Sequence, residues 1–305
     1  MVNPVSENIA TSSGVVVAIT VLEGASKPYM DKDGIIWVKS GADKRRATSR
    51  EEIQRMFQNS GLIHGDEIPV RGLTTRDVDL GSFGAFYEKV YGEAFDPEPE
   101  GVARLFRNMN LASDEWLNVA GTLLFAKLPS SRLPVFTIKA ISYPGTGIDL
   151  ERYSDSQDLL GTVQDQYRAA IAFILRDLRH LQGDRNINSE GEPEIPRLVF
   201  EELVANALIH RDYFISASIR LFVFTDRIEI ISPGHLPNNL SIENIKNGNS
   251  NIRNPVLASH ASKLLPYRGL GSGISRALKA WPRIDFVDDR DGNLFKAVVF
   301  FGDSN

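Results

Sequence analysis

The clearest hydrophobic pattern in the chain is helical and runs from Leu198 to Tyr213, LVFEELVANALIHRDY. Apolar residues recur there at helical spacing and predict one face that packs against a core. Glu202, Asn206 and His210 recur every four residues, so we expect them in one row along the same helix. Asparagine offers a neutral oxygen to Mg²⁺ and glutamate can activate a water. The row therefore indicates metal–phosphate chemistry, and a solvated helix face is the alternative.

Strand patterns dominate the first sixty residues. The run 14–22 is apolar and β-branched, and residues 35–39 read IIWVK, so each predicts a strand. A helix is expected in the following segment, SREEIQRMFQ, where Thr48 or Ser49 can act as the cap. Two strands and a helix are too little for an independent core. We therefore expect residues 1–60 to pack on the rest of the chain or to be the end of a larger domain.

Residues 61–190 predict a middle module that is mostly helical and contains one strand, at 135–143. The segment Trp116–Leu128 is consistent with a helix–turn–helix that reads DNA. The alternative is a helical layer that only packs against the core. Leu159 is expected to open the longest periodic helix. A polar connector with two prolines follows, and it sets the predicted domain boundary near residue 190.

The last third of the chain alternates between strand and helix patterns. Ser218–Phe224 and the segment RIEIIS predict a hairpin, and the loop SPGHLP then stops its second strand. Further helices are expected over Pro255–Leu265 and in ISRALKAW, with a final strand in NLFKAVVFF. Residues 191–305 therefore predict a separate domain in which helices cover a sheet.

Three glycines at alternate positions, Gly269, Gly271 and Gly273, stand directly before the predicted helix ISRALKAW. Glycines in this arrangement let backbone amides approach a phosphate, and the N-terminus of a helix adds positive potential. A glycine-rich turn with no ligand is the alternative. The run is not the dinucleotide fingerprint, because it does not follow an apolar strand and its spacing is GxGxG.

The order of these segments resembles the histidine-kinase-like ATPase superfamily, also called the GHKL or Bergerat fold. That resemblance implies an α/β sandwich in which ATP lies between helices and a sheet under a mobile lid. It implies Glu202 as the general base, Asn206 as the Mg²⁺ ligand and residues 247–255 as part of the lid. The alternatives are a structural Glu202 carboxylate that caps a helix or pairs with an arginine, and an Asn206 side chain that hydrogen-bonds the loop. The residues implied or considered as nucleotide contacts are Asn206, Arg211, Gly234, Arg253, Gly269, Gly271 and Gly273. For Arg211 the alternatives are a structural pairing with an aspartate at the end of the helix and contact with a partner subunit. For Arg253 the alternative is a structural role in tying down the lid.

A closer resemblance joins the segments NALIHRDY, DRIEIISPGHLP, RNPVLA and GLGSGI to the C-terminal domain of proteins described as RecG-like helicases or transcriptional regulators. Those proteins usually carry an N-terminal Schlafen-type AlbA_2 domain, and residues 21–57 look like its last part. Two departures stand out. Ser232 occupies the position of the superfamily's adenine-binding aspartate, and the acidic start of the AlbA_2 domain has no counterpart. The chain also lacks the GxxxxGK[ST] pattern of a P-loop.

Composition narrows the function classes. The formal net charge of −5 argues against a uniformly basic nucleic-acid surface, although the cluster Lys44-Arg45-Arg46 could form a local one. The absence of cysteine excludes disulfides and thiolate metal sites. No run of about 18 apolar residues and no signal-peptide pattern occur, so a soluble, cytoplasmic protein without a membrane partner is expected.

These patterns and the resemblance together predict an α+β protein: a partial AlbA_2-like unit (1–60), a helical middle module (61–190) and a GHKL-type domain (191–305). The predicted function is ATP binding with slow Mg²⁺-dependent hydrolysis, which acts as a conformational switch in transcription or nucleic-acid processing. The alternative is a non-catalytic, DNA-binding transcriptional regulator with a degenerate GHKL-like domain. The expected partners are a nucleotide, DNA or RNA, and further copies of the chain. A Schlafen-like nuclease activity is disfavoured, because the acidic N-terminal part is lacking.

Overall fold

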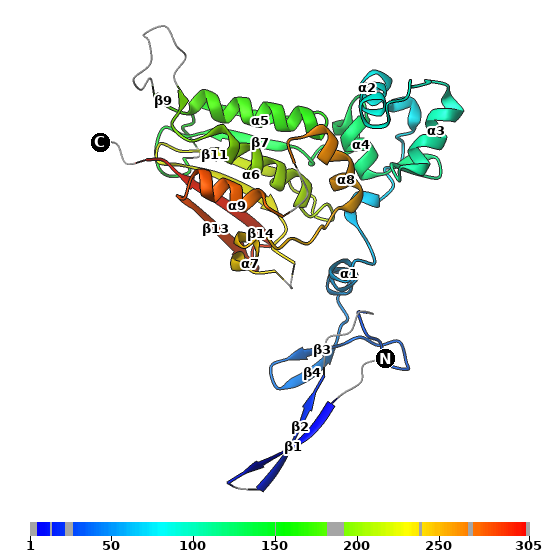
Figure 1. The fold of residues 1–305 in the computed structure, drawn as a ribbon, viewed down its shortest axis with the longest axis vertical. Coiled ribbons are helices and arrows are strands. Elements are labelled where there is room, and N and C mark those ends of the chain that lie inside the picture. Colours follow the sequence, from blue (N-terminus) through cyan, green and yellow to red (C-terminus); the bar gives the residue numbers. More distant parts are fainter. Residues whose placement is uncertain are drawn as a thin grey trace. The chain divides into compact units, whose positions relative to one another are not determined.

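The computed structural model describes residues 5–12, 14–21, 27–149, 151–181, 192–237, 240–267 and 271–302. The architecture is α+β, as the sequence predicts (Figure 1). Contacts divide the chain into two compact units, Met1–Ile63 and His64–Asn305.

The first unit contains two antiparallel hairpins. One is formed by β1 (Val5–Thr11) and β2 (Gly14–Thr20), and the other by β3 (Trp37–Ser40) and β4 (Asp43–Arg46). The apolar run that predicts β2 does form a strand, yet its valines and isoleucine are exposed on both faces of the hairpin. Hydrophobicity therefore predicts the local conformation here but not a core.

Helix α1 (Arg50–Asn59) completes this unit. It begins after Ser49, whose hydroxyl accepts a hydrogen bond from the Glu52 amide, so one of the two predicted caps is used. The Glu52 carboxylate in turn pairs with both terminal nitrogens of Arg45, at 2.6 and 2.8 Å.

The second unit is built on a six-stranded mixed sheet in the order β13-β14-β12-β11-β7-β8. Only the β7–β11 pair is parallel among the described strands of this sheet. The strands are β7 (Ile138–Ser142), β8 (Asp155–Leu159), β11 (Ile219–Val223), β12 (Arg227–Pro233), β13 (Ile284–Asp289) and β14 (Leu294–Phe300). Strands from the predicted middle module and from the predicted C-terminal domain thus share one sheet, and contacts do not separate the two at residue 190.

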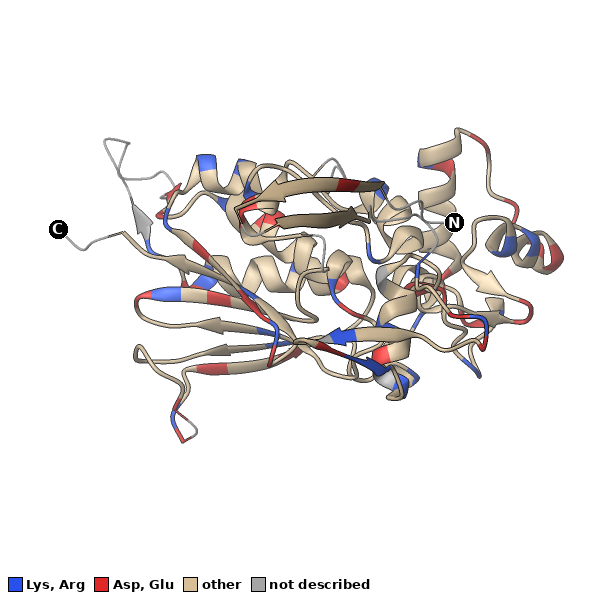
Figure 2. Ribbon diagram, turned by 90° about the horizontal axis from the view of Figure 1, so that it is seen from below, with Lys and Arg blue, Asp and Glu red and all other residues tan. Residues whose placement is uncertain are grey.

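Helices α5 (Val163–Asp177), α6 (Arg197–His210) and α9 (Gly273–Ala280) cover one face of this sheet (Figure 1). Successive side chains of a strand point to opposite faces of the sheet, so alternate residues face these helices. Together with the helices they form one hydrophobic core. Helix α6 is apolar on nearly all sides because the sheet, α5 and α9 surround it. Lysine, arginine, aspartate and glutamate residues are interspersed along the helices and strands (Figure 2).

The start of α5 differs from the prediction. Leu159 is the last residue of strand β8, not the first of a helix, because residues 155–159 pair with β7 along the edge of the sheet. Gly161 then turns the chain with a φ of +98°. Thr162 and Asp165 form a capping box at the start of α5.

A helical group packs beside the sheet and contains α2 (Leu80–Tyr91), α3 (Pro99–Asn108), α4 (Val119–Phe125) and α8 (Pro255–Leu264). Phe83 lies at the centre of its aromatic core, with ring centroids of neighbours at 4.7 to 6.2 Å. Every residue of α4 is buried. A helix in this position cannot enter a DNA groove, so the helix–turn–helix interpretation of Trp116–Leu128 is wrong and the packing-layer alternative holds.

The shorter elements connect these layers. They are the 3-10 turns Gly65–Glu67, Thr75–Asp77 and Pro129–Ser131, the strand pairs β5 (Ala112–Ser113) with β6 (Trp116–Leu117) and β9 (His180–Leu181) with β10 (Glu192–Pro193), and helix α7 (Ile242–Lys246). No described helix has both the length and the apolar character that a bilayer crossing demands.

Candidate functional site

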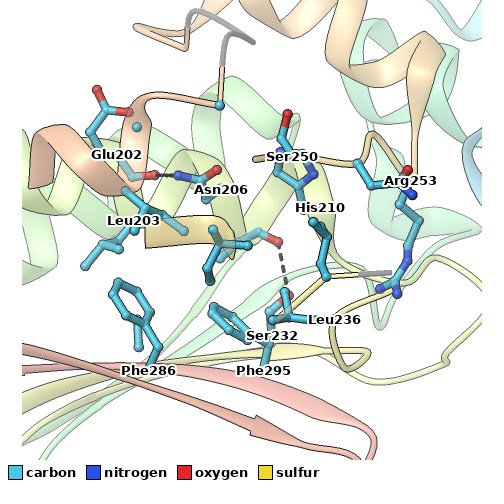
Figure 3. Close-up of a pocket in the computed structure, with 18 of the residues that line it drawn as sticks. Glu202, Leu203, Asn206, His210, Ser232, Leu236, Ser250, Arg253, Phe286 and Phe295 are labelled. Atoms are coloured by element: carbon cyan, nitrogen blue, oxygen red, sulfur yellow. Dashed lines mark hydrogen bonds between the residues drawn. The ribbon is translucent and has the colours of Figure 1, made fainter. Parts of the chain in front are cut away.

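A pocket opens between α6, the strands β12 to β14 and the start of α9 (Figure 3). It contains about 1040 Å³ of empty space, including the part that is open to solvent. The loop that follows β12 and the loop that follows α7 complete its rim.

The floor of the pocket is apolar. Phe286 and Phe295 project from β13 and β14 with stacked rings whose centroids are 5.9 Å apart. Leu203 of α6 and Ile230 of β12 lie beside them. These side chains lie on the side of the strands that faces α6 and on the side of α6 that faces the sheet. The floor of the pocket is therefore continuous with the hydrophobic core. It offers a flat apolar surface to a ring-shaped ligand.

Glu202 and Asn206 lie side by side at one end of the pocket (Figure 3), and Gly273 meets them there. The Asn206 side-chain amide donates to the Glu202 backbone oxygen at 2.8 Å, which leaves its own oxygen for another partner. Gly273 approaches both side chains closely. A Cβ at this glycine would lie 2.5 Å from Glu202 Oε2 and 3.1 Å from Asn206 Nδ2. The structure thus brings together three residues that the sequence selects from places some seventy positions apart.

The Glu202 carboxylate forms an ion pair with an arginine, the contact that the structural alternative for this residue describes, and the sequence did not identify which arginine it is. Glu202 Oε1 lies 2.6 Å from Nη2 of Arg276, which stands one helical turn after Gly273 in α9. The glutamate side chain is 3% exposed and the arginine side chain 27%. The spacing of three residues between Gly273 and Arg276 is a helical signal that could have indicated this neighbour.

His210, the third member of the predicted row, also lines the pocket. Its Nε2 lies 2.9 Å from the Tyr267 hydroxyl. Burial, reinforced by the positive charge of Arg253, lowers the pKa of His210 to about 4, so the imidazole is neutral at physiological pH. It can exchange a hydrogen bond with a ligand but contributes no charge.

Arg211 does not line the pocket. Its guanidinium is buried, stacks over the rings of Phe136 and Tyr213 at 4.6 and 4.9 Å, and donates to the backbone oxygens of Ile215 and Ala217. The expectation that Arg211 contacts a nucleotide is therefore not supported by its position, and the structural alternative describes it better.

Arg253 lines the pocket at the end away from Glu202 (Figure 3). It donates to the His235 backbone oxygen at 2.8 Å. Gly234 lies directly against it: a Cβ there would be 2.5 Å from Arg253 Nη1, and the φ of +100° independently favours glycine. Gly234 and Arg253 thus shape the same corner of the rim.

The other glycines of the run have different positions. Gly271 lines the pocket with a φ of +70°, and a Cβ there would collide with the Gly248 backbone oxygen. Gly271 therefore packs against the segment predicted as a lid. Gly269 and Arg268 lie outside the described residues.

Ser232 lies on β12 in the pocket wall, and its hydroxyl donates to the Ala207 backbone oxygen at 3.2 Å. This hydrogen bond ties β12 to α6. Of the described residues that line the pocket, only Glu202 carries a carboxylate. A carboxylate equivalent to the superfamily's adenine-binding aspartate is therefore not present in the described wall.

Asp66 and Asn254 hold the segment around the end of the predicted lid in place. The Asp66 carboxylate accepts a hydrogen bond from the Leu257 amide at 2.8 Å and so caps α8 from a distant part of the chain. Asn254, fully buried, donates to the backbone oxygens of Ile209 and Arg211 at the end of α6. These contacts hold the rim of the pocket to its helical wall.

The possible metal ligand in this pocket is the Asn206 side-chain oxygen. Across the described ranges, no three histidine, aspartate or glutamate side chains gather as a metal site would require. Mg²⁺ commonly takes one or two protein ligands and completes its shell with phosphate oxygens and waters. The donor set fits an ion that arrives with a polyphosphate ligand.

Comparisons with known proteins agree with this description at the level of domain and fold. Residues 216–288 match the family model HATPase_c_4, described as "Putative ATP-dependent DNA helicase recG C-terminal". The match includes the hairpin, the rim loops, Gly273 and Arg276, and it begins after Glu202 and Asn206. This part of the chain is thus similar to an ATPase-type domain.

A crystal structure of the DIP2311 protein from Corynebacterium diphtheriae, a structural genomics target, is similar over 98% of this chain with a TM-score of 0.58 and 20% identity. The similarity concerns the fold. The chain spans 59% of the length of that protein. Among curated proteins, none matches the sequence.

Proposed function

We propose that the pocket binds ATP with Mg²⁺, hydrolyses it slowly and uses the nucleotide as a conformational switch in a regulatory or nucleic-acid-processing protein. The observation that carries this proposal is the close approach of the Gly273 backbone to Glu202 and Asn206. A base, a metal ligand and a side-chain-free backbone at one end of a pocket with an aromatic floor are the parts that phosphoryl chemistry on a nucleotide requires. The ATPase-type family match over residues 216–288 supports the same interpretation.

The phosphates would lie at the start of α9. Ser272, the N-cap residue, makes no side-chain capping hydrogen bond, so the first amides of α9 receive none from their own cap. Gly273 brings this helix end to the pocket with no side chain in the way. A helix N-terminus whose amides are not capped by the N-cap side chain favours an anion.

In the proposed hydrolysis, Glu202 accepts a proton from the attacking water. The water oxygen forms a bond to the terminal phosphorus, the bond from that phosphorus to the bridging oxygen breaks, and ADP leaves with the electron pair. Asn206 would hold Mg²⁺ through its oxygen, and the bound ion would neutralise phosphate charge. The burial of Glu202 keeps bulk water away from this carboxylate.

The apolar floor would receive the base. Phe286 and Phe295 present ring surfaces, and stacking on aromatic rings stabilises any nucleobase. The neutral His210 and its partner Tyr267 supply hydrogen-bonding groups in the same wall.

The switch would act through the rim loop that follows α7. Ser275 of α9 donates to the Lys246 backbone oxygen at 2.6 Å, and Gly271 packs against Gly248. A phosphate that rearranges the start of α9 would change both contacts. Nucleotide binding is thereby coupled to the position of this loop.

Isothermal titration with ATP and Mg²⁺ tests the proposal, and an absence of binding at millimolar nucleotide would overturn it. Glu202→Gln should abolish hydrolysis without weakening binding. Glu201→Gln is the matched control, since Glu201 precedes it in α6, pairs with Arg197 outside the pocket and should leave both unchanged. Equal loss of binding and hydrolysis in Glu202→Gln would remove the base assignment.

A second candidate function, nucleic-acid binding, rests on the hairpin of β3 and β4. The register places Trp37 opposite Arg46 and Lys39 opposite Lys44, so these four side chains share one face. Trp37 is 40% exposed, with Lys44 at 4.9 Å and Arg46 at 5.4 Å from its ring centroid. An exposed aromatic ring among cations can stack on a base while the cations contact phosphates.

The structure divides the basic cluster of the sequence into two roles. Arg45 points to the other face and pairs with Glu52, whereas Lys44 and Arg46 flank the tryptophan. Fluorescence anisotropy with labelled single-stranded DNA over a salt series tests this surface. Trp37→Ala with Lys44→Ala should weaken binding at least about ten-fold, and Arg55→Ala on α1 should have little effect. Equal weakening by both changes would indicate only general charge attraction.

A further inference from the structure

We infer that Arg276 is a positioning residue that exchanges partners during nucleotide binding, from the Glu202 carboxylate to the terminal phosphate. This inference rests on the proposed nucleotide function and names a residue that controls the same site. Its starting point is the ion pair of 2.6 Å between Arg276 Nη2 and Glu202 Oε1.

The two partners differ in their freedom to move. Glu202 stands in the middle of α6, is 3% exposed and has its second oxygen against the Gly273 backbone. Arg276 is 27% exposed, stands in the first turns of α9 and lines the pocket. When a new anion arrives, the arginine is therefore the partner that can swing toward it.

The guanidinium also has unused hydrogen-bonding capacity. Its Nε is buried and makes no hydrogen bond among the described residues. A buried donor without a partner costs free energy, and a guanidinium can bind a phosphate and a carboxylate oxygen through different nitrogens. Arg276 is thus already oriented within the site and is only partly satisfied.

The position of Arg276 matches the expected position of the phosphates. It follows Gly273 by three residues, so one helical turn separates it from the amides at the start of α9. Arg253, the other arginine that lines the pocket among the described residues, lies at the far end from Glu202. Arg276 is consequently the arginine beside the reacting end.

The exchange has a chemical consequence. While Arg276 is bound to Glu202, it neutralises the carboxylate and occupies the oxygen Oε1 that would accept the proton of a water. A triphosphate that attracts the guanidinium leaves a buried carboxylate without its cation, which favours its protonation. Glu202 is then free to act as a base only when a nucleotide is present, so the ion pair keeps the base inactive in the empty site.

A double-mutant cycle on nucleotide affinity tests the exchange, because the carboxylate and the phosphate compete for one guanidinium. Glu202→Gln keeps the side chain's shape, releases Arg276 and should tighten Mg²⁺–ATP binding about ten-fold. Arg276→Met should weaken ATP binding about ten-fold, leave AMP binding unchanged and be partly rescued by Arg276→Lys. In the double variant the tightening caused by Glu202→Gln should disappear. Lys279→Met, a change at an exposed cation on the same helix that does not line the pocket, is the control and should leave the affinity unchanged.

The outcomes separate this inference from the function on which it rests. If the wild-type protein binds no ATP, the proposed function fails. If the wild-type protein binds ATP but Glu202→Gln leaves its affinity unchanged, or the two substitutions act additively, the ion pair is only a clamp between α6 and α9 and the exchange is refuted. Each variant should give the same circular dichroism spectrum as the wild type. A change in affinity then cannot be due to unfolding.

Discussion

Substitution of Gly273 by alanine should destabilise the second unit even though alanine is the better helix former. The new Cβ would lie 2.5 Å from Glu202 Oε2 and 3.1 Å from Asn206 Nδ2. The tip of an exposed glutamate would simply rotate away from such a methyl group. Glu202 is buried and paired with Arg276, so its movement would weaken that ion pair.

The magnitude follows from these opposing effects. Overpacking costs about 1–3 kcal/mol, and loss of a buried pair that leaves a charge behind costs up to about 3–5 kcal/mol. Replacing glycine by alanine in a helix interior stabilises the folded state by about 1 kcal/mol at most, and by less near the N-terminus. We therefore expect a net loss of about 1–4 kcal/mol.

Urea denaturation followed by circular dichroism measures this difference. The control is Gly101→Ala near the start of α3, where the Cβ would approach Glu98 Oε2 no closer than 3.4 Å. This variant should be neutral or slightly stabilised. If Gly273→Ala is as stable as the wild type, the glycine is not required by the packing of Glu202 and Asn206, and the geometry assigned to the site is incorrect.

Three further predictions concern charge, burial and specificity. Burial raises the pKa of Asp66 to about 6, so the folded state binds the proton more tightly than the unfolded chain and stability falls as pH rises from about 4 to about 6. Asp66→Asn keeps an acceptor for the Leu257 amide and should be more stable than the wild type at pH 8 by up to about 3 kcal/mol, with the gain vanishing near pH 4; urea titrations with an equal gain at both pH values would contradict this. Arg211→Lys should lose the stacking on Phe136 and about 1–3 kcal/mol of stability while ATP affinity stays unchanged, and a calorimetric affinity loss would return Arg211 to the site. Ser232 stands in the pocket wall and Glu202, at the proposed phosphate end, is the one carboxylate among the described lining residues, so ATP and GTP should bind within about ten-fold of each other in competition titrations. A preference above about ten-fold would contradict this and would require a group in the pocket that distinguishes the two bases.

Local periodicity accounts for the parts of the site that were predictable. The four-residue repeat of Glu202, Asn206 and His210 places them in one row on any helix, and the structure has all three along the pocket. Alternation likewise predicts the hairpin of β11 and β12, because its inward residues must meet the core. Glycines before a helix indicate a close backbone approach, and Gly273 makes one.

The remainder depends on contacts between distant parts of the chain. Arg276 and Arg211 are both arginines near the ends of helices, and only the tertiary structure turns one toward Glu202 and the other onto Phe136. Strand β8 reads DSQDL, which has no apolar alternation because it lies at the edge of the sheet, so its pairing with β7 was missed. The union of the predicted middle and C-terminal segments follows from a different pairing, the parallel one between β7 and β11, which joins strands about eighty residues apart.

A crystal structure with a non-hydrolysable ATP analogue and Mg²⁺ tests the central claim most directly. We expect density for the triphosphate beside the Gly273 backbone and Asn206, with the base over Phe286 and Phe295 and with Arg276 turned from Glu202 to the terminal phosphate. Nucleotide bound elsewhere, or a pocket without nucleotide at millimolar concentration, would contradict the assignment of this pocket as an ATP site.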